Sequence, residues 1–246
     1  MAWPRILSGL IYPPRQVGSF QSPSGREIDA WVEAAGTEHF ERIDDAFVTR
    51  ALGLGVSGGM VLDLDSRLGL VSMKLLWREE GLLCMGVYGS LDVAERVRHT
   101  AGEWGLGKRM FFQVGDPMDL RFKAEYFDIV VSDGALHTTG NPRRLLGEIA
   151  RVAKPAGAIL LAQTARPARL RMRKVLSEGT ADCPDTLRSW QDARVRSGYT
   201  RAELADLVRA AGLERTRVVE DRGFLFIERP GANDPSSWVS EREKYY

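Results

Sequence analysis

The feature that most constrains the fold of this chain is a regular alternation, between residues 60 and 161, of short apolar runs with segments of helical spacing. The apolar runs are typical of strands buried on both faces, and they span residues 60–64, 82–87, 110–114, 127–131 and 158–161. The segments between them carry apolar residues three and four positions apart, and Ser90 precedes one of them as an N-cap. Strands and helices in this order predict a parallel sheet with helices on both faces.

The C-terminal part departs from this alternation. Thr200 is predicted to cap a helix that ends at Gly212, and two further apolar runs follow at residues 216–219 and 224–227. Only four residues separate these two runs, and a connection this short joins antiparallel strands. We therefore predict an α/β protein whose mostly parallel sheet ends in an antiparallel C-terminal hairpin.

The 246 residues suffice for one large α/β domain. We expect an irregular N-terminal arm over residues 1–26, a single domain over residues 27–229 and a polar tail over residues 230–246. Residues 164–201 interrupt the alternation with nine basic and four acidic residues, a net charge of +5. This basic insertion is either a solvated surface balanced by distant acids or a lid over a substrate cleft.

Charge and composition exclude several classes of function. The chain has 34 Lys and Arg against 33 Asp and Glu, which argues against a nucleic-acid-binding surface over the whole molecule. Two cysteines and three histidines without ligand spacing predict neither a disulfide framework nor a metal site. No apolar run reaches membrane-spanning length and no secretory signal is visible, so we expect a cytoplasmic protein without a membrane anchor.

Ligands of open α/β sheets bind beyond the carboxyl ends of the strands. Five motifs of this chain fit the pattern of one family of proteins with such a sheet. The motifs are residues 61–64 with Gly69, Gly115-Asp116, residues 127–132, residues 148–157, and residues 198–200 followed by 211–213. In this order they resemble the class I S-adenosylmethionine (SAM) methyltransferase superfamily of small-molecule type, over about residues 40–229. The resemblance implies a Rossmann-like seven-stranded sheet, SAM as cofactor and a small-molecule acceptor.

The resemblance also implies which residues contact the cofactor: Asp63, Asp65, Arg67, Gly69, Tyr88, Asp116, Pro117 and Ser132. Asp65 and Arg67 depart from the family pattern, because they occupy two of the three glycine positions of its first loop. Tyr88 stands where the family has an acid that binds both ribose hydroxyls. A phenol cannot replace that bidentate acceptor, and its loss costs about 2–3 kcal/mol, or roughly 30–150-fold in affinity.

Two functions therefore stay open. One is a working methyltransferase, in which His137 beyond the fourth predicted strand is a candidate general base; the alternative for His137 is a packed loop histidine. The other is a pseudo-methyltransferase that has lost SAM and serves as a non-catalytic partner or scaffold, through the N-terminal arm or residues 164–201. A nicotinamide-dependent dehydrogenase fits less well, because the chain lacks the glycine-rich loop and the acid after the second strand.

The basic insertion also bears on the acceptor. Its net charge favours an anionic small molecule. It carries only Trp190 and Tyr199 as aromatic residues, so a nucleic-acid partner is not expected.

Overall fold

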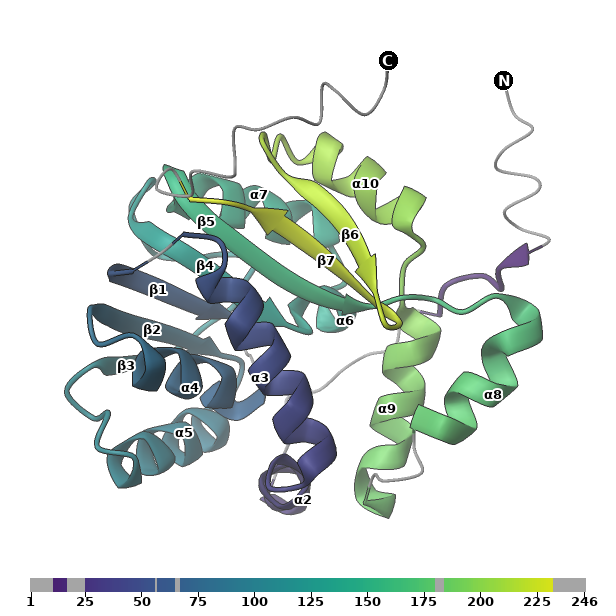
Figure 1. Ribbon diagram of the computed structural model, residues 1–246, viewed down its shortest axis with the longest axis horizontal. Helices are drawn as coiled ribbons and strands as arrows, with labels where there is room; N and C mark the ends of the chain where they lie inside the picture. The colour runs from purple at the N-terminus through teal and green to yellow at the C-terminus, as the bar shows by residue number, and fades with distance from the viewer. Residues whose placement is uncertain (1–10, 17–24, 56, 65–66, 180–183, 232–246) are drawn as a thin grey trace.

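A single seven-stranded sheet forms the centre of the molecule (Figure 1). The computed structural model describes residues 11–16, 25–55, 57–64, 67–179 and 184–231. The strands are β1 (Gly59–Leu64), β2 (Leu82–Tyr88), β3 (Met110–Val114), β4 (Phe127–Asp133), β5 (Ala153–Thr164), β6 (Arg217–Asp221) and β7 (Phe224–Arg229). Their order is β3-β2-β1-β4-β5-β7-β6, and only the pairs β5–β7 and β6–β7 are antiparallel. The predicted mostly parallel sheet with an antiparallel hairpin is confirmed.

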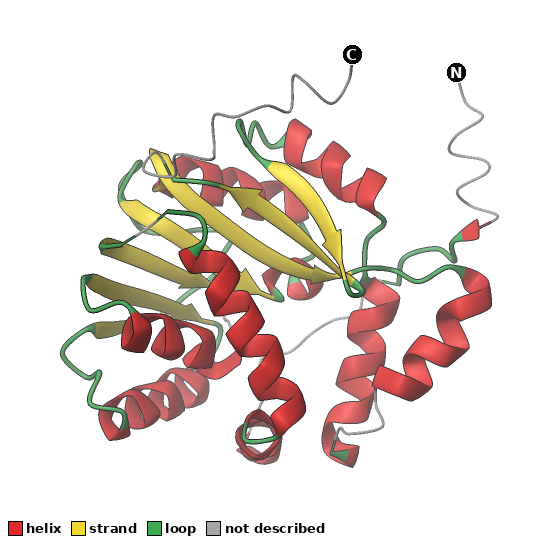
Figure 2. Ribbon diagram, viewed as in Figure 1, coloured by secondary structure: helices red, strands yellow, loops and turns green. Residues whose placement is uncertain are grey.

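Helices cover both faces of the sheet (Figure 2). They are α2 (Gly25–Ala35), α3 (Glu38–Leu52), α4 (Leu70–Arg78), α5 (Leu91–Glu103), α6 (Ala135–Thr138), α7 (Pro142–Val152), α8 (Arg169–Gly179), α9 (Asp185–Ser197) and α10 (Arg201–Ala210), with a short 3₁₀ turn, η1 (Arg67–Gly69), before α4. Neighbouring residues of one strand point to opposite faces, so Val61 packs in the core beneath α2–α5 and Leu62 in the core beneath α7 and α10. Continuously apolar strands are therefore required, as the alternation predicts.

Two helix starts follow from local side-chain hydrogen bonds. The Val93 N–H donates to Ser90 Oγ at 3.3 Å at the start of α5. At the start of α10, the Glu203 N–H donates to Thr200 Oγ1 and the Thr200 N–H donates to the Glu203 carboxylate, which makes a capping box. Both predicted N-caps are confirmed, and each stabilises its helix by about 1 kcal/mol.

The C-terminal hairpin turns through two residues, Arg222 and Gly223, with φ of +47° and +83°. Two left-handed residues match the right-handed twist of the flanking strands. Phe224 pairs with Thr164, the last residue of β5, so the hairpin tip lies at the carboxyl edge of the parallel strands. The hairpin thus brings Asp221 and Arg222 to the edge where a ligand is expected.

The start of β5 differs from the sequence expectation. β5 begins at Ala153 rather than at residue 158, because Ala153 already pairs with Phe127 of β4 and the Arg229 side chain donates to the carbonyls of Lys154 and Gly157. The interruption at residues 164–201 contains two helices, α8 and α9, which lie side by side beyond the sheet (Figure 1).

The ends of the chain are described only in part. Of the predicted arm, residues 11–16 lie against the end of α9, where the Gln16 N–H donates to the Arg196 carbonyl at 3.1 Å and the Arg15 guanidinium stacks on Tyr199 at 4.1 Å. Residues 1–10, 17–24 and most of the predicted tail lie outside the described residues. Within the described part, none of the helices combines the length and the apolar character needed to cross a membrane.

Candidate functional site

The carboxyl ends of β1, β2 and β4 bring several predicted site residues to one edge. Asp63 of β1 stands opposite Gly86 of β2 and Val131 of β4 in the sheet register. The Gly115 N–H donates to the Tyr88 carbonyl at 3.0 Å, so Asp116 follows directly beside the end of β2. The predicted residues of three strands are thus neighbours in space.

Tyr88 is a core residue in this structure. It is fully buried, and its ring lies over Gly86, where an added Cβ would be 2.5 Å from the ring. Its hydroxyl donates to Asp63 Oδ2 at 3.5 Å and would be 2.8 Å from a Cβ on Gly69. Gly69 and Gly86 are therefore small because Tyr88 needs the space. Position 88 offers no exposed acceptor to a ribose.

The last two residues of the first loop have left-handed backbone angles. Leu68 has φ of +54° and Gly69 has φ of +73°, and Gly69 then begins α4 as its N-cap. The predicted contacts of Asp65 lie outside the described residues, and so does the side chain of Arg67. Both stay predictions.

Asp116 and Ser132 have different positions at the edge. Asp116 is exposed at the end of β3 beside the half-buried Pro117, and its Oδ1 accepts the Met118 N–H at 2.8 Å. Ser132 is 2% exposed, and its hydroxyl donates to the Leu64 carbonyl at 2.8 Å and accepts the Ala135 N–H at 3.1 Å. Ser132 therefore ties the end of β4 to the end of β1, while Asp116 is accessible to a ligand.

His137 is enclosed by the protein. Its Nε2 accepts the Thr164 N–H at 3.2 Å, and its Nδ1 lies 3.1 Å from Ser197 Oγ and 2.8 Å from the amide nitrogen of Gln163. Burial, and then the charge of Arg194, hold the pKa of His137 well below its usual value. The neutral ring joins α6, β5 and α9. Proton abstraction by His137 would first require these bonds to break, and its predicted role as a base stays a prediction.

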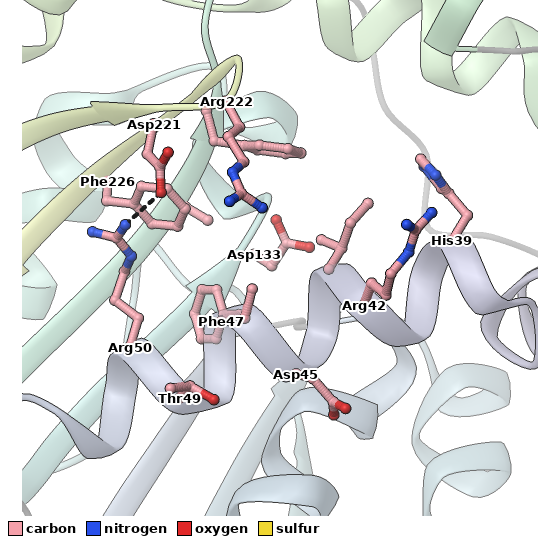
Figure 3. Close-up of a pocket in the computed structure, with 14 residues that line it drawn as sticks. His39, Arg42, Asp45, Phe47, Thr49, Arg50, Asp133, Asp221, Arg222 and Phe226 are labelled. Carbon is pink, nitrogen blue, oxygen red and sulfur yellow. Dashed lines mark hydrogen bonds and ion pairs between the residues drawn. The ribbon is translucent and has the colours of Figure 1, made fainter.

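A cavity of about 830 Å³ opens between α3, the ends of β4 and β5, and the hairpin tip (Figure 3). Phe47 of α3 and Phe224 and Phe226 of β7 give it apolar walls, and Ala162 of β5 also lines it. Its most buried polar residue is Asp133, the last residue of β4, which is 4% exposed.

The Asp133 carboxylate is fixed by an ion pair. Asp133 Oδ1 lies 3.1 Å from Arg194 Nη2 of α9, and both side chains are at most 3% exposed. The Arg194 guanidinium also lies 4.9 Å from the centroid of the Trp190 ring, which meets the ring of Trp31 of α2 edge-to-face with the centroids 4.6 Å apart. The basic insertion thus supplies the positive charge that balances the Asp133 carboxylate. No group of three or more metal-ligating side chains occurs within the described ranges.

Comparison with known proteins agrees with this geometry. Residues 64–161 match a family profile described as a methyltransferase domain. Residues 64–161 thus have the sequence pattern of a methyltransferase domain, and the seven-stranded sheet is similar in fold to solved methyltransferase structures. A solved structure from Methanococcus maripaludis, described as a candidate SAM-dependent methyltransferase, superposes with a TM-score of 0.65 at 15% identity, over 87% of this chain and 97% of that one.

Two curated relatives match part of this chain in sequence. One is a probable tocopherol O-methyltransferase of rice, 34% identical over 101 residues, or 41% of this chain and 28% of the relative. The other is a biotin biosynthesis bifunctional protein of Teredinibacter turnerae, 31% identical over 149 residues, or 58% of this chain and 25% of the relative. The chain spans about a quarter of the length of these relatives.

The family implies SAM as the cofactor. The described residues at the carboxyl ends of the parallel strands fit this cofactor with one exception. The strand order matches the fold, and Asp116 offers an exposed carboxylate where the adenine contact is expected. Asp63 lies at the end of β1, where the family has its first acid, and its carboxylate is buried against Tyr88. The exception is the contact to the ribose, because the buried Tyr88 stands where the family has the acid that binds the ribose hydroxyls.

Sequence reasoning missed Asp133, Arg194 and the lining arginines Arg42 and Arg222. Asp133 directly follows Ser132 at a predicted strand end, so its position was a usable signal. Arg194 gave no such signal, because it lies 61 residues from Asp133 in the chain.

Proposed function

We propose that this protein is a SAM-dependent methyltransferase whose acceptor is a small molecule bound in the cavity between α3 and the β6–β7 hairpin. The observation that carries this proposal is the position of the cavity. Its most buried polar residue, Asp133, lies two residues after Val131, which stands opposite Asp63 in the sheet. Acceptor cavity and cofactor edge are therefore adjacent, at the end of the sheet where α/β enzymes bind their ligands.

The side chains of this protein would act mainly by positioning the acceptor relative to the methyl group. When bound, SAM supplies a methyl group on a sulfonium centre for direct displacement. The phenylalanine walls would hold the acceptor and exclude water, which fixes the reacting atoms in line. Asp133, held in one orientation by Arg194, would accept a hydrogen bond from the hydroxyl or amine of the acceptor.

Two further observations support a small acceptor. The two curated relatives carry names that refer to small molecules, tocopherol and biotin. The cavity volume of about 830 Å³ is that of a small-molecule site. We also propose that α9 supports this site, because it supplies Arg194, the ionic partner of Asp133.

Calorimetric titration of the full chain with SAM and with S-adenosylhomocysteine tests the function. We expect both to bind, with Kd raised by the missing ribose acid toward the high micromolar range. Asp116→Ala should weaken binding about tenfold or more, through loss of the adenine contact. Asp119→Ala is the matched control, because Asp119 is an exposed carboxylate of the same loop.

The absence of binding at about 1 mM of either compound would overturn the proposal. That result would favour the alternative, a non-catalytic protein of methyltransferase fold. The specific observation that favours this alternative is the burial of Tyr88 at the position of the ribose-binding acid.

A further inference from the structure

The cavity between α3 and the hairpin carries an uncompensated positive charge. Each acidic side chain of its lining has a basic partner, in the pairs Asp45–Lys74, Asp133–Arg194 and Asp221–Arg50, with N–O distances of 3.1, 3.1 and 2.8 Å. The lining residues Arg42 and Arg222 are exposed and have no acidic partner within 4.0 Å in the described part of the chain. They come from opposite walls, Arg42 from α3 and Arg222 from the hairpin tip (Figure 3).

Arg222 is unusual for its place in the backbone. It has φ of +47° in a two-residue turn, a conformation that asparagine and glycine adopt more readily than arginine. Local turn chemistry therefore disfavours arginine here, while its side chain lines the cavity. A residue held against its backbone preference at a cavity is a reason to look for a function of the side chain.

The remainder of the lining is suited to an apolar body. Phe47, Phe224 and Phe226 form the apolar walls, and Phe224 and Phe226 lie with their ring centroids 6.3 Å apart. The Arg50 guanidinium lies 4.2 Å over the ring of Phe226, but Arg50 is already paired with Asp221. The exposed part of the lining thus carries the cations available to a ligand, and the phenylalanines are more buried.

We propose that this cavity binds an apolar small molecule with one anionic group, a carboxylate or a phosphate, held at the mouth by Arg222 and Arg42. The apolar body lies against the phenylalanines, and the opposite end of the molecule reaches Asp133. Guanidinium groups recognise carboxylate and phosphate by paired, charge-assisted hydrogen bonds. The inference rests on the proposed function, for which it names the class of acceptor.

The test uses the full chain without SAM and three probes of similar size: cinnamate, phenyl phosphate and the neutral cinnamamide. Binding is measured by calorimetry or ligand-observed NMR at two salt concentrations. We expect one or both anions to bind, at least about tenfold more tightly than the amide, because the amide lacks the charge. Affinity for the anions should fall with added salt, since both arginines are exposed. The two anions together show which anionic group the site prefers.

Arg222→Asn is the decisive variant. It should reduce affinity for the bound anion about tenfold or more, while the melting temperature stays equal or rises, because asparagine suits the left-handed turn. Arg42→Gln should also weaken anion binding. Arg98→Asn on α5 is the matched control, an exposed arginine away from the cavity that should leave affinity unchanged.

Three results would overturn the inference: no binding of either anion at about 10 mM, equal affinity for cinnamate and cinnamamide, or unchanged anion affinity in Arg222→Asn. The calorimetry with SAM separates this inference from the proposed function. If SAM binds and the anions do not, only the inference fails. If the anions bind and SAM does not, the cavity is an anion site and the methyltransferase function fails.

Discussion

Replacing Arg194 by methionine removes the counter-charge of Asp133 and the guanidinium over the Trp190 ring, and leaves an unbranched apolar side chain in its place. Both side chains of this pair are at most 3% exposed, so water cannot replace the lost partner. A buried carboxylate whose ionic partner is removed destabilises a fold by about 3–5 kcal/mol. For a domain of this size, that corresponds to a fall of about 6–20 °C in melting temperature.

The assay is thermal and urea unfolding of wild type, Arg194→Met, Asp133→Asn and the double variant Asp133→Asn/Arg194→Met. The double variant should recover most of the loss, because a neutral buried pair avoids the cost of burying charge. Arg188→Met is a matched control on the same helix. Its ion pair with Asp185 has side chains 56% and 90% exposed and is worth under about 1 kcal/mol.

Two results would refute this reasoning. A melting temperature of Arg194→Met within about 2 °C of wild type would mean that the pair is not buried as described. A double variant less stable than either single variant would mean that the charges are not each other's main partners.

Three other predictions concern separate parts of the fold. Because the buried His137 stays neutral while the unfolded residue takes up a proton, the free energy of unfolding should fall as pH drops below 6.5, by up to about 1.4 kcal/mol per pH unit from this residue. His137→Asn should flatten that slope in urea unfolding at pH 5–7; parallel slopes would contradict the prediction. Tyr88→Ala should cost about 3–5 kcal/mol in urea unfolding by opening a core cavity, whereas Tyr88→Phe, which keeps the ring and loses the hydroxyl with its long contact to Asp63, should cost far less; equal losses would refute it. Thr200→Ala should cost about 1 kcal/mol, measured by circular dichroism melting, and an unchanged melting temperature would argue against the capping box.

The sequence was sufficient for features whose causes lie within a few residues. Apolar runs and helical spacing predict the strands and helices, since each pattern reflects the side-chain direction of its own element. Ser90 and Thr200 mark helix starts because their partners are three residues away. The short connection near residue 222 predicts an antiparallel hairpin for the same local reason.

The site was predictable only in part. Asp63, Gly69, Tyr88 and Asp116 could be placed at one edge, because carboxyl ends of parallel strands meet there. The direction of the Tyr88 side chain could not be predicted, since it depends on the space that Gly69 and Gly86 leave.

By itself the sequence determined the order of elements, the parallel sheet and the reversed final strand, because the period of apolar residues and the capping side chains act locally. Only the tertiary structure decided that Tyr88 is a core residue, that His137 has both ring nitrogens bonded, and that Asp133 meets Arg194 across 61 residues of chain. These arrangements depend on which distant groups share a buried space, where an unpaired charge or an unbonded polar atom is costly. No local sequence pattern shows which distant groups will meet. The cavity and its two arginines could therefore be identified only in the tertiary structure.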